Sequence, residues 1–214
     1  MFKLNWKEMA CILLVLVAVF NAVLWYPSMP DVVVTHWDAA GVANGWGPKW
    51  LGLFLVPMLI AVMYGFLSII PYIEVLKQNV KKFYGHYENF KLVLVAFLFA
   101  IYATSVAVNA GVAVPFSAVI FVGMGLVMYY AGVMTEHSKR NFFIGMRTPW
   151  TLSSDEVWDK TNKLGGLLLK ILGVLAVPLA FDGLQWFLVW MLLALLAMAC
   201  LTAYSYLEFN KKKR

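Results

Sequence analysis

The stretch Leu92–Thr135, "LVLVAFLFAIYATSVAVNAGVAVPFSAVIFVGMGLVMYYAGVMT", decides the fold class because it contains no Asp, Glu, Lys or Arg. Its length is about twice the ~20 residues that a helix needs to cross a ~30 Å hydrocarbon core. Backbone polar groups cannot be left bare in lipid, so apolar segments of this kind form helices. The stretch therefore predicts two membrane-spanning helices, Leu92–Gly111 and Ala113–Thr135, joined by a tight turn at Val112.

The rest of the chain follows the same pattern. Hydrophobic residues make up 63% of the 214 residues and charged residues 13%, about half the ~25% of an average soluble domain. The sequence predicts an all-α, polytopic six-helix transmembrane bundle in a single membrane domain, residues 1–214, with spans at Met9–Tyr26, Leu51–Ile73, Leu92–Gly111, Ala113–Thr135, Leu164–Phe181 and Gln185–Tyr206. A small extracytoplasmic loop, residues 27–50, forms a cap. A cytoplasmic loop, residues 136–163, contains an amphipathic helix.

The distribution of basic residues predicts the orientation in the membrane. Of the 17 Lys and Arg residues, 15 lie before span 1, between spans 2 and 3, between spans 4 and 5, or in the tail Lys211–Arg214. Lys49 is the one that lies in the loop after span 1, and Lys170 lies inside span 5. Cytoplasmic loops carry the excess of Lys and Arg, so both termini are expected in the cytoplasm. The net charge of +6 then indicates contact with anionic lipid of the bilayer and no direct binding of nucleic acid.

Few polar groups fall inside the predicted spans. Lys170 lies about seven residues into span 5, where its ammonium can snorkel to the cytoplasmic interface; an internal functional cation is the alternative. No span carries an Asp or Glu near its centre, which argues against a proton- or sodium-coupled transporter. Gly123, Gly125 and Gly132 in span 4 are small enough to admit a neighbouring helix.

The outer loop contains two short segments with strand or turn character. "DVVVTHW", Asp31–Trp37, is β-branched, and "GVANGWG", Gly41–Gly47, has the Asn-Gly pattern of a tight turn. We expect a small folded cap with Trp side chains at the headgroup level. One His and two acids, without a second His or a Cys, make a weak ligand set, so no metal is predicted. The candidate ligand-binding residues of the cap are His36, Trp37, Asp38, Gly41 and Gly45.

The cytoplasmic loop carries the most unusual sequence of the chain, "NFFIGMRTPWTLSSDEVWD", Asn141–Asp159. Gly145 allows a tight bend, and Pro149 forces Thr148 toward an extended conformation. Ser153 followed by Glu156 matches a capping box. The helix that it starts is expected to run from Ser154 to about Lys163 along the membrane interface, and then to bend at Gly165-Gly166 into span 5.

Arg147 is the residue of this loop that local physics does not explain. Its planar guanidinium offers five donors, so it can make bidentate contacts that Lys cannot match. We expect it to bond backbone carbonyls or a carboxylate, Asp155 or Glu156, with Trp150 packed beside it. The role would be to shape a docking surface. The sequence contains no Ser/His/Asp set, HExxH motif or P-loop, so we predict no catalytic residue, no enzyme activity and no cofactor.

The segment "NFFIGMRTPWTLSSDEVWDKTNKLGG" resembles the signature of the SdpI-type membrane protein family. The family pattern falls on Asn141, Gly145, Arg147 to Leu152, Trp158 and Gly165. Asn162 departs from it, because many relatives have His there. The outer loop resembles the domain of unknown function that commonly precedes this signature, and the matching residues are Pro30, His36, Trp37, Gly41, Gly45 and Lys49.

The resemblance implies a function in the plasma membrane of a prokaryote. The founding member of the family protects its cell from a secreted toxic peptide and is thought to tether a small transcriptional repressor at the membrane. A peptide toxin outside and a cytoplasmic repressor inside are therefore the expected partners. The candidate partner-binding residues of the signature are Asn141, Gly145, Arg147, Thr148, Pro149, Trp150, Thr151 and Trp158. The alternatives are an uncharacterised membrane enzyme or lipid-handling protein, a small transporter, or a scaffold.

Overall fold

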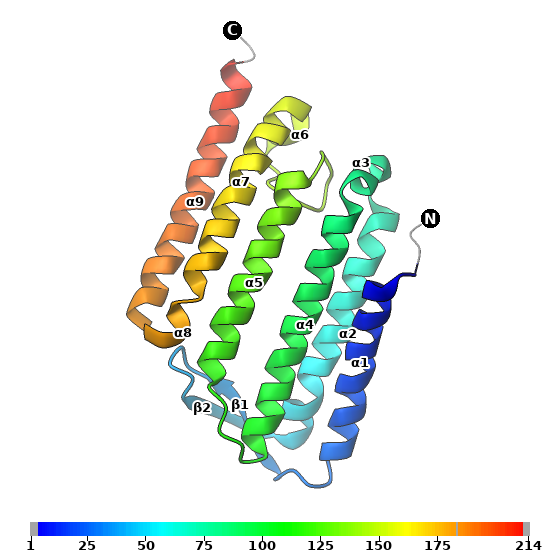
Figure 1. Cartoon of the computed structure of the whole chain (residues 1–214), viewed down its shortest axis with the longest axis vertical. Coiled ribbons are helices and arrows are strands. Elements are labelled where there is room, and N and C mark those ends of the chain that lie inside the picture. Colours follow the sequence, from blue (N-terminus) through cyan, green and yellow to red (C-terminus); the bar gives the residue numbers. More distant parts are fainter. Residues whose placement is uncertain (1–3, 183, 212–214) are drawn as a thin grey trace.

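The computed structural model describes residues 4–182 and 184–211. Within these residues, six long helices lie side by side and alternate in direction (Figure 1). They are α1 (Trp6–Trp25), α2 (Lys49–Ile73), α4 (Tyr84–Asn109), α5 (Phe116–His137), α7 (Asp155–Ala176) and α9 (Leu184–Lys211). Short helices α3 (Lys77–Lys82), α6 (Pro149–Ser153) and α8 (Leu179–Asp182) and the strands β1 (Val32–Trp37) and β2 (Ala43–Pro48) connect them. The predicted all-α, polytopic bundle is confirmed.

Five of these helices are long and apolar enough to cross a membrane: α1, α2, α4, α5 and the segment Trp186–Lys211 of α9. The sixth, α7, begins with charged turns that lower its hydropathy, yet it packs lengthwise against α5 and α9. The predicted bend at Gly165-Gly166 is wrong, because α7 is one continuous helix from Asp155 to Ala176. The physical reason is packing: a Cβ at Gly166 would lie 2.6 Å from the carbonyl oxygen of Gly132 on α5.

The bundle consists of two groups of three helices. The N-terminal group contains α1, α2 and α4, the C-terminal group contains α5, α7 and α9, and the two meet along α4 and α5 (Figure 1). A core of buried side chains fills each group. A third cluster joins the groups at the end that carries α3 and α6, with members from α2, α3, α4, α5 and the loop after α5: Leu67, Ile70, Val80, Phe83, Tyr87, Met134 and Ile144.

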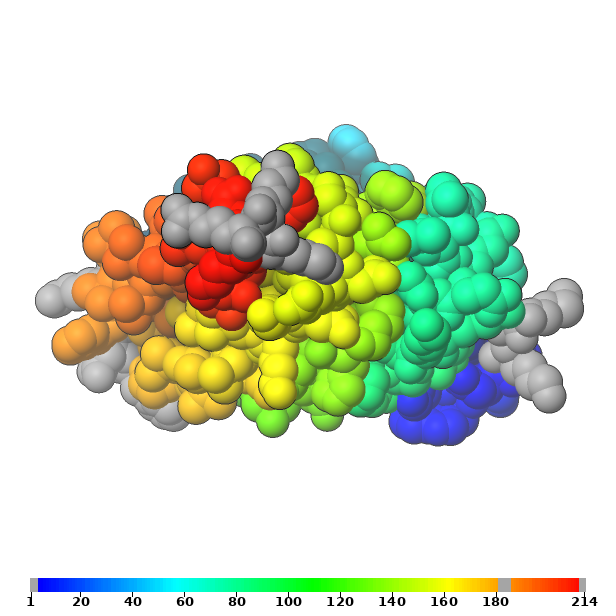
Figure 2. All heavy atoms as spheres, turned by 90° about the horizontal axis from the view of Figure 1, so that it is seen from above, coloured from blue at the N-terminus to red at the C-terminus, as the bar shows by residue number. Residues whose placement is uncertain are grey.

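The first residue of α1 and the last residue of α9 lie at the end of the bundle that carries α3 and α6, and the two-stranded sheet lies at the opposite end (Figure 1). This arrangement agrees with the expectation that both termini share one side of the membrane. Figure 2 shows the α3 and α6 end, where the segment between α5 and α7 lies between the last turns of α9 and α3.

The connections differ in detail from the prediction. Between α4 and α5 the chain uses residues 110–115 rather than a turn at Val112 alone, and Gly111 has a φ of +86°. The other predicted tight turn, Asp182–Leu184, includes Gly183, which lies outside the described residues. In both places the paired helices are antiparallel neighbours, as expected.

The sheet forms a cap over the first turns of α2 and the last turns of α4, at the end of the bundle opposite to α3 and α6. Its strands pair in antiparallel register from Val32 with Pro48 to Trp37 with Ala43. The predicted tight turn at Asn44-Gly45 is wrong, because both residues lie inside β2. The turn occurs at Asp38–Val42 instead, where the Asp38 carboxylate accepts hydrogen bonds from two backbone N–H groups and Gly41 has a φ of +81°. These features favour a turn more strongly than the Asn-Gly pair.

Two contacts hold the cap on the helices. The amide of Asn109, at the end of α4, donates to the carbonyl oxygen of Val34 at 3.0 Å and accepts from its N–H at 2.8 Å. Val33 packs onto α2 so closely that a Cβ at Gly52 would lie 2.4 Å from its Cγ2. The cap is therefore fixed to α2 and α4 rather than suspended on a flexible loop.

Candidate functional site

Asn141 shapes the start of the signature loop, which we define as residues 138–154 between α5 and α7. Its buried side chain accepts hydrogen bonds from the N–H groups of Phe143 (2.9 Å) and Ile144 (2.6 Å). It donates to the carbonyl oxygens of Lys139 (2.8 Å) and Ile144 (2.9 Å). One amide thus satisfies four buried backbone groups, which would otherwise carry a desolvation cost.

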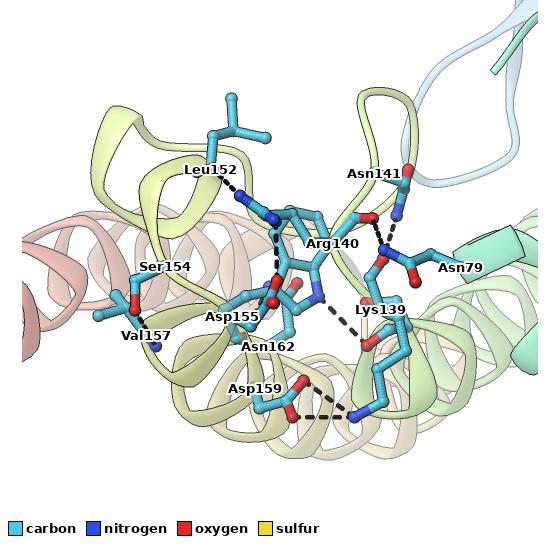
Figure 3. A network of polar contacts seen from close by, with 12 residues as sticks. Asn79, Lys139, Arg140, Asn141, Leu152, Ser154, Asp155, Val157, Asp159 and Asn162 are labelled. Atoms are coloured by element: carbon cyan, nitrogen blue, oxygen red, sulfur yellow. Dashed lines mark hydrogen bonds and ion pairs between the residues drawn. The ribbon is translucent and has the colours of Figure 1, made fainter. Parts of the chain in front are cut away.

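Glu74 ties this loop to the end of α2. Its carboxylate is fully buried and accepts from the N–H of Phe142 at 2.9 Å and from the N–H of Leu76 at 2.8 Å. Asn79 of α3 adds a bond from its side chain to the carbonyl oxygen of Arg140 at 2.8 Å (Figure 3). The signature loop is therefore linked to the N-terminal group as well as to its own.

Gly145 and Asn162 form the second fixed point. Gly145 has a φ of +99°, and a Cβ there would lie 2.5 Å from the side-chain oxygen of Asn162. That oxygen accepts from the N–H of Met146 at 2.7 Å, while the Asn162 amide donates to the carbonyl oxygen of Trp158 at 3.1 Å. Trp158 is itself fully buried and donates from its indole to the carbonyl oxygen of Ser138 at 3.1 Å.

Thr148 and Thr151 start α6 with a reciprocal capping box. The N–H of Thr148 donates to the hydroxyl of Thr151 at 2.9 Å, and the N–H of Thr151 donates to the hydroxyl of Thr148 at 3.2 Å. The Thr148 hydroxyl also donates to that of Ser205 on α9 at 3.0 Å. Pro149 occupies the first helical position, where its missing N–H costs nothing, and Thr148 is extended with a ψ of 162°, as predicted.

The capping box predicted at Ser153 and Glu156 is wrong. Ser153 is the last residue of α6, and its hydroxyl donates to the carbonyl oxygen of Pro149 at 2.6 Å. Ser154 caps α7 instead, with its hydroxyl accepting from the N–H of Val157 at 3.5 Å (Figure 3). The reason is that Pro149 nucleates a short helix, which shifts the next helix start by one residue.

Arg147 lies on the exposed side of the loop and donates to the carbonyl oxygen of Phe142 at 2.5 Å. This contact confirms the expected bond to a backbone carbonyl. The carboxylate of Asp155 pairs with Arg140 instead, at 2.7 Å, and Arg140 also donates to the carbonyl oxygen of Leu152 at 3.0 Å (Figure 3). Arg140 could not be singled out from the sequence, because nothing local distinguishes it from the other basic residues of the loop.

Trp150 packs against α9 rather than in a pair with Arg147. Its ring meets that of Tyr206 edge-on, with 5.2 Å between centroids. Ion pairs add to the same junction: Lys160 lies 2.9 Å from Glu208 of α9 and 3.0 Å from Glu156. The hydrogen bond to Glu208 raises the pKa of Lys160 above its usual range. Because Lys160 is exposed, these ion pairs add little stability.

Lys170 has a partner that the sequence did not reveal. Its ammonium lies 2.6 Å from the carboxylate of Glu136 on α5, and both side chains are about one quarter exposed. Lys139 and Asp159 form a similar pair at 2.8 Å (Figure 3). Lys170 is thus paired across the helix contact, a third arrangement beside the snorkelling and the internal-cation interpretations.

The N-terminal group contains a buried charged cluster that sequence reasoning missed. Lys91 is 1% exposed; its ammonium pairs with Glu8 of α1 and lies 3.5 Å from the Ser68 hydroxyl. Asn5 donates to Glu88 of α4, and the Tyr64 hydroxyl of α2 donates to Glu8 at 3.0 Å. The cluster lies in the first turns of α1 and α4, so no acid of it sits at the centre of a span. Its signal in the sequence was weak, because Glu8 and Lys91 are 83 residues apart.

The cap residues named from the sequence come together around β1. The His36 ring nitrogen Nδ1 lies 2.5 Å from the side-chain oxygen of Asn44, and the Trp37 ring stacks on Phe116 of α5 with 4.0 Å between centroids. Asp38 and Gly41 make the turn, and Gly45 has a packing role, because a Cβ there would lie 2.9 Å from the Cβ of His36. Among the described residues, no group of three or more His, Cys, Asp or Glu is placed to hold a metal ion.

A cavity of about 220 Å³ lies beneath β1. Four elements line it, with Thr35, His36 and Trp37 from β1, Leu51, Gly52, Leu55 and Val56 from α2, Ile101 and Ser105 from α4, and Phe116 from α5. It sits at the cap end of the line where the two helix groups meet. The signature loop occupies the opposite end of the bundle (Figure 1).

Comparisons with known proteins match the segment that contains the signature loop and the segment that contains the cap. The model of the SdpI/YfhL protein family matches residues 137–205, and that of a domain of unknown function, DUF1648, matches residues 12–61. The chain is 24% identical over 209 residues to the Immunity protein SdpI of Bacillus subtilis (strain 168), covering 96% of this chain and 97% of that protein. No solved structure matches. With several apolar helices, the signature loop and the cap in the matched order, these findings support a multi-pass membrane protein of the SdpI family.

Proposed function

We propose that this protein is an immunity protein of a prokaryotic plasma membrane, which recognises a secreted toxic peptide at its cap and docks a cytoplasmic regulator at its signature loop. The observation that carries the proposal is the similarity to an immunity protein over nearly the full length of both chains. Because the match includes the cap, the helices and the signature loop together, it supports a shared role for the whole molecule rather than for one segment.

The charge at the two ends supports the proposed orientation. The end that carries the signature loop exposes Lys77, Lys81 and Lys82 of α3, and Figure 2 shows this end of the molecule. At the cap end, Lys49 is paired with Asp31 at 3.0 Å. The basic end would face the cytoplasm under the positive-inside rule, with both termini there and the cap outside.

The signature loop is suited to present a fixed surface to a partner. Its polar residues Asn141, Thr148 and Thr151 are buried and bonded to backbone groups, so they hold the shape of the loop. Phe142 is 49% exposed, and Arg147 is exposed beside it. An apolar ring next to a cation on a rigid loop is the kind of surface that protein partners bind. We therefore favour binding over catalysis as the role of this loop.

The immunity role is tested by replacement of the relative. A Bacillus subtilis strain that lacks its own SdpI would express this chain and be exposed to the sporulation-delay toxin. Survival at a membrane level matched to that of native SdpI is the expected result. Death at that level would contradict immunity against this toxin. The docking role is tested separately, by isolating the chain from membranes with and without toxin and identifying the cytoplasmic protein that co-purifies only with it.

A further inference from the structure

We infer that the cavity beneath β1 receives one uncharged apolar side chain, aromatic or branched aliphatic, from the peptide that the cap recognises. This inference rests on the proposed function and adds to it the place and the chemistry of recognition. It is carried by the size of the cavity, by its polar and charged surroundings, and by the way in which the edge of β1 is occupied.

The size of the cavity fits one side chain better than a whole small molecule. Binding sites for small molecules generally measure ~300–1,000 Å³, and this cavity measures about 220 Å³. Apolar groups form most of its wall, with the rings of Trp37 and Phe116 stacked at one side. A ring or branched chain that entered it would be removed from water, which is the main source of affinity for such anchors.

Among the described residues that line the cavity there is no Asp, Glu, Lys or Arg, and the charged groups of the cap make contacts elsewhere. Lys49 pairs with Asp31 and lies 5.0 Å from the ring centroid of Tyr26, and the Asp38 carboxylate accepts two backbone N–H groups of the turn. A charged side chain entering the cavity would lose its hydration without gaining a partner. The occupant is therefore uncharged.

The polar groups of the wall favour a peptide over a lipid chain. Thr35, His36 and Ser105 contribute polar atoms beside the apolar ones. An acyl chain would leave such atoms without a partner, whereas the backbone next to an inserted side chain can donate and accept hydrogen bonds at the rim. A phospholipid would also require a cation for its phosphate, and Lys49 is engaged with Asp31.

Strand addition is a weaker explanation at this edge of the sheet. A peptide can extend a sheet by bonding the free N–H and C=O groups of an edge strand. At Val34, however, both backbone groups are bonded by the amide of Asn109. Because β1 is closed at this residue, recognition next to the cavity relies on the side chain that enters it.

The experiment measures the binding of a minimal probe to the full chain in lipid nanodiscs. The probe is N-acetyl-tryptophanamide, one aromatic side chain on an uncharged peptide unit, and its contact with the protein is followed by saturation-transfer NMR. N-acetyl-glycinamide provides the same backbone without the side chain, and decanol represents an acyl chain. None of these requires the toxin, so the result is independent of the survival assay.

Two variants fill the cavity, and one matched variant does not. Ile101→Phe and Leu55→Trp each add volume at a lining residue, and the second serves if the first does not fold. Val32→Trp adds a large ring on the exposed side of the same strand, where Val32 is outside the cavity lining. Thermal unfolding and a single gel-filtration peak confirm that each variant is folded.

The expected result is saturable binding of the tryptophanamide and no binding of the glycinamide. A folded filling variant should weaken the affinity ~10- to 100-fold, the equivalent of losing one buried aromatic side chain, and Val32→Trp should leave it unchanged. The inference is overturned if binding survives in a folded filling variant, or if decanol displaces the probe and binds more tightly. If neither filling variant folds, the Ser105→Cys variant is labelled with a thiol reagent in the presence and in the absence of the probe. Labelling of this thiol that the probe does not slow refutes the inference. Survival in the toxin assay together with absent probe binding would leave the immunity role intact and refute this site alone.

Discussion

The two helix groups of this protein are held together in opposite ways. In the N-terminal group, charged side chains join the helices: the buried ammonium of Lys91 on α4 pairs with Glu8 of α1 and lies 3.5 Å from the hydroxyl of Ser68 on α2. In the C-terminal group, α5 and α7 touch backbone to backbone, since a Cβ at Gly125 would lie 2.6 Å from the carbonyl oxygen of Gly173. One interface depends on charge balance. The other depends on the absence of side chains.

Because of this difference, the two groups are expected to tolerate different substitutions. A buried ion pair gives little net stability when intact but costs much when one partner is removed. Close helix packing in membranes relies on small residues, because lipid offers no hydrophobic force between helices. Charge-removing changes should therefore damage the N-terminal group most, and size-increasing changes the C-terminal group.

The largest effect is expected for Lys91→Met. The change nearly keeps the length of the buried side chain but leaves the carboxylate of Glu8, whose side chain is 12% exposed, without its cation, which should lower the free energy of unfolding by up to ~3–5 kcal/mol. Titration of the purified protein with SDS, followed by circular dichroism, measures it. Lys77→Met, at an exposed residue, is the control. The double variant Glu8→Gln, Lys91→Met should recover part of the loss; if it does not, the charge imbalance is not the cause.

A somewhat smaller loss is expected for Gly166→Ala. The new methyl group would meet the Cβ of Glu136 and the carbonyl oxygen of Gly132, each at 2.6 Å, so α5 and α7 must separate. Overpacking of this kind costs ~1–3 kcal/mol. Gly65→Ala is the matched control, because nothing lies within 4 Å of its Cβ position. Equal unfolding curves for the two alanine variants would contradict the contrast between the groups.

Substitutions of Asn162 test whether this position in the C-terminal group requires a side chain that forms hydrogen bonds or only one of suitable size. Asn162→Leu removes the acceptor for the buried N–H of Met146 and should cost ~1–3 kcal/mol. Asn162→His keeps one ring nitrogen to accept and one to donate, so a smaller loss is expected. Thermal unfolding in detergent compares the two. A histidine variant as unstable as the leucine variant would show that shape, and not hydrogen bonding, sets this position.

The smallest effect on stability, with a large effect on activity, is expected for Arg147→Lys. Arg147 is exposed and donates to the carbonyl oxygen of Phe142, so the free energy of unfolding should change by less than ~1 kcal/mol. A lysine cannot reproduce the planar fork, so survival in the toxin assay should fall nearly as far as with Arg147→Ala. Lys139→Ala, at an exposed ion pair of the same end, is the control. Full activity of the lysine variant would mean that charge alone is sufficient.

Much of the fold was predictable because the membrane makes the length of an apolar segment decisive. The segments that became α1, α2, α4, α5 and α9 were each identified in this way. The continuity of α7 was not, because Gly165-Gly166 is as compatible with a bend as with close packing, and the choice is made by Gly132 on another helix. Local sequence contains no information about that partner.

The candidate site, like the fold, was predictable from the sequence only in part. The extended Thr148 and the bend at Gly145 follow from the chemistry of proline and glycine and were predicted. A capping box was predicted at Ser153 and occurs at Thr148, because Pro149 and two hydroxyl residues compete to start a helix. The pairing of Glu8 with Lys91 was out of reach, because it joins residues that are distant in sequence and only become neighbours when three helices assemble.

Helix α4 has a mechanical property that follows from its contacts at both ends. Its 26 residues make a rod of ~39 Å, with Asn109 bound to the cap at one end and Lys91 in the charged cluster toward the other. A tilt of only ~5° about the midpoint would move each end by ~1.7 Å, comparable to the helix shifts of ~1–2 Å that switch other proteins. Lys91 lies ~8 Å from the midpoint and would move by ~0.7 Å, so a small rotation at the cap would also change the geometry of the contacts that Lys91 makes with Glu8 and Ser68.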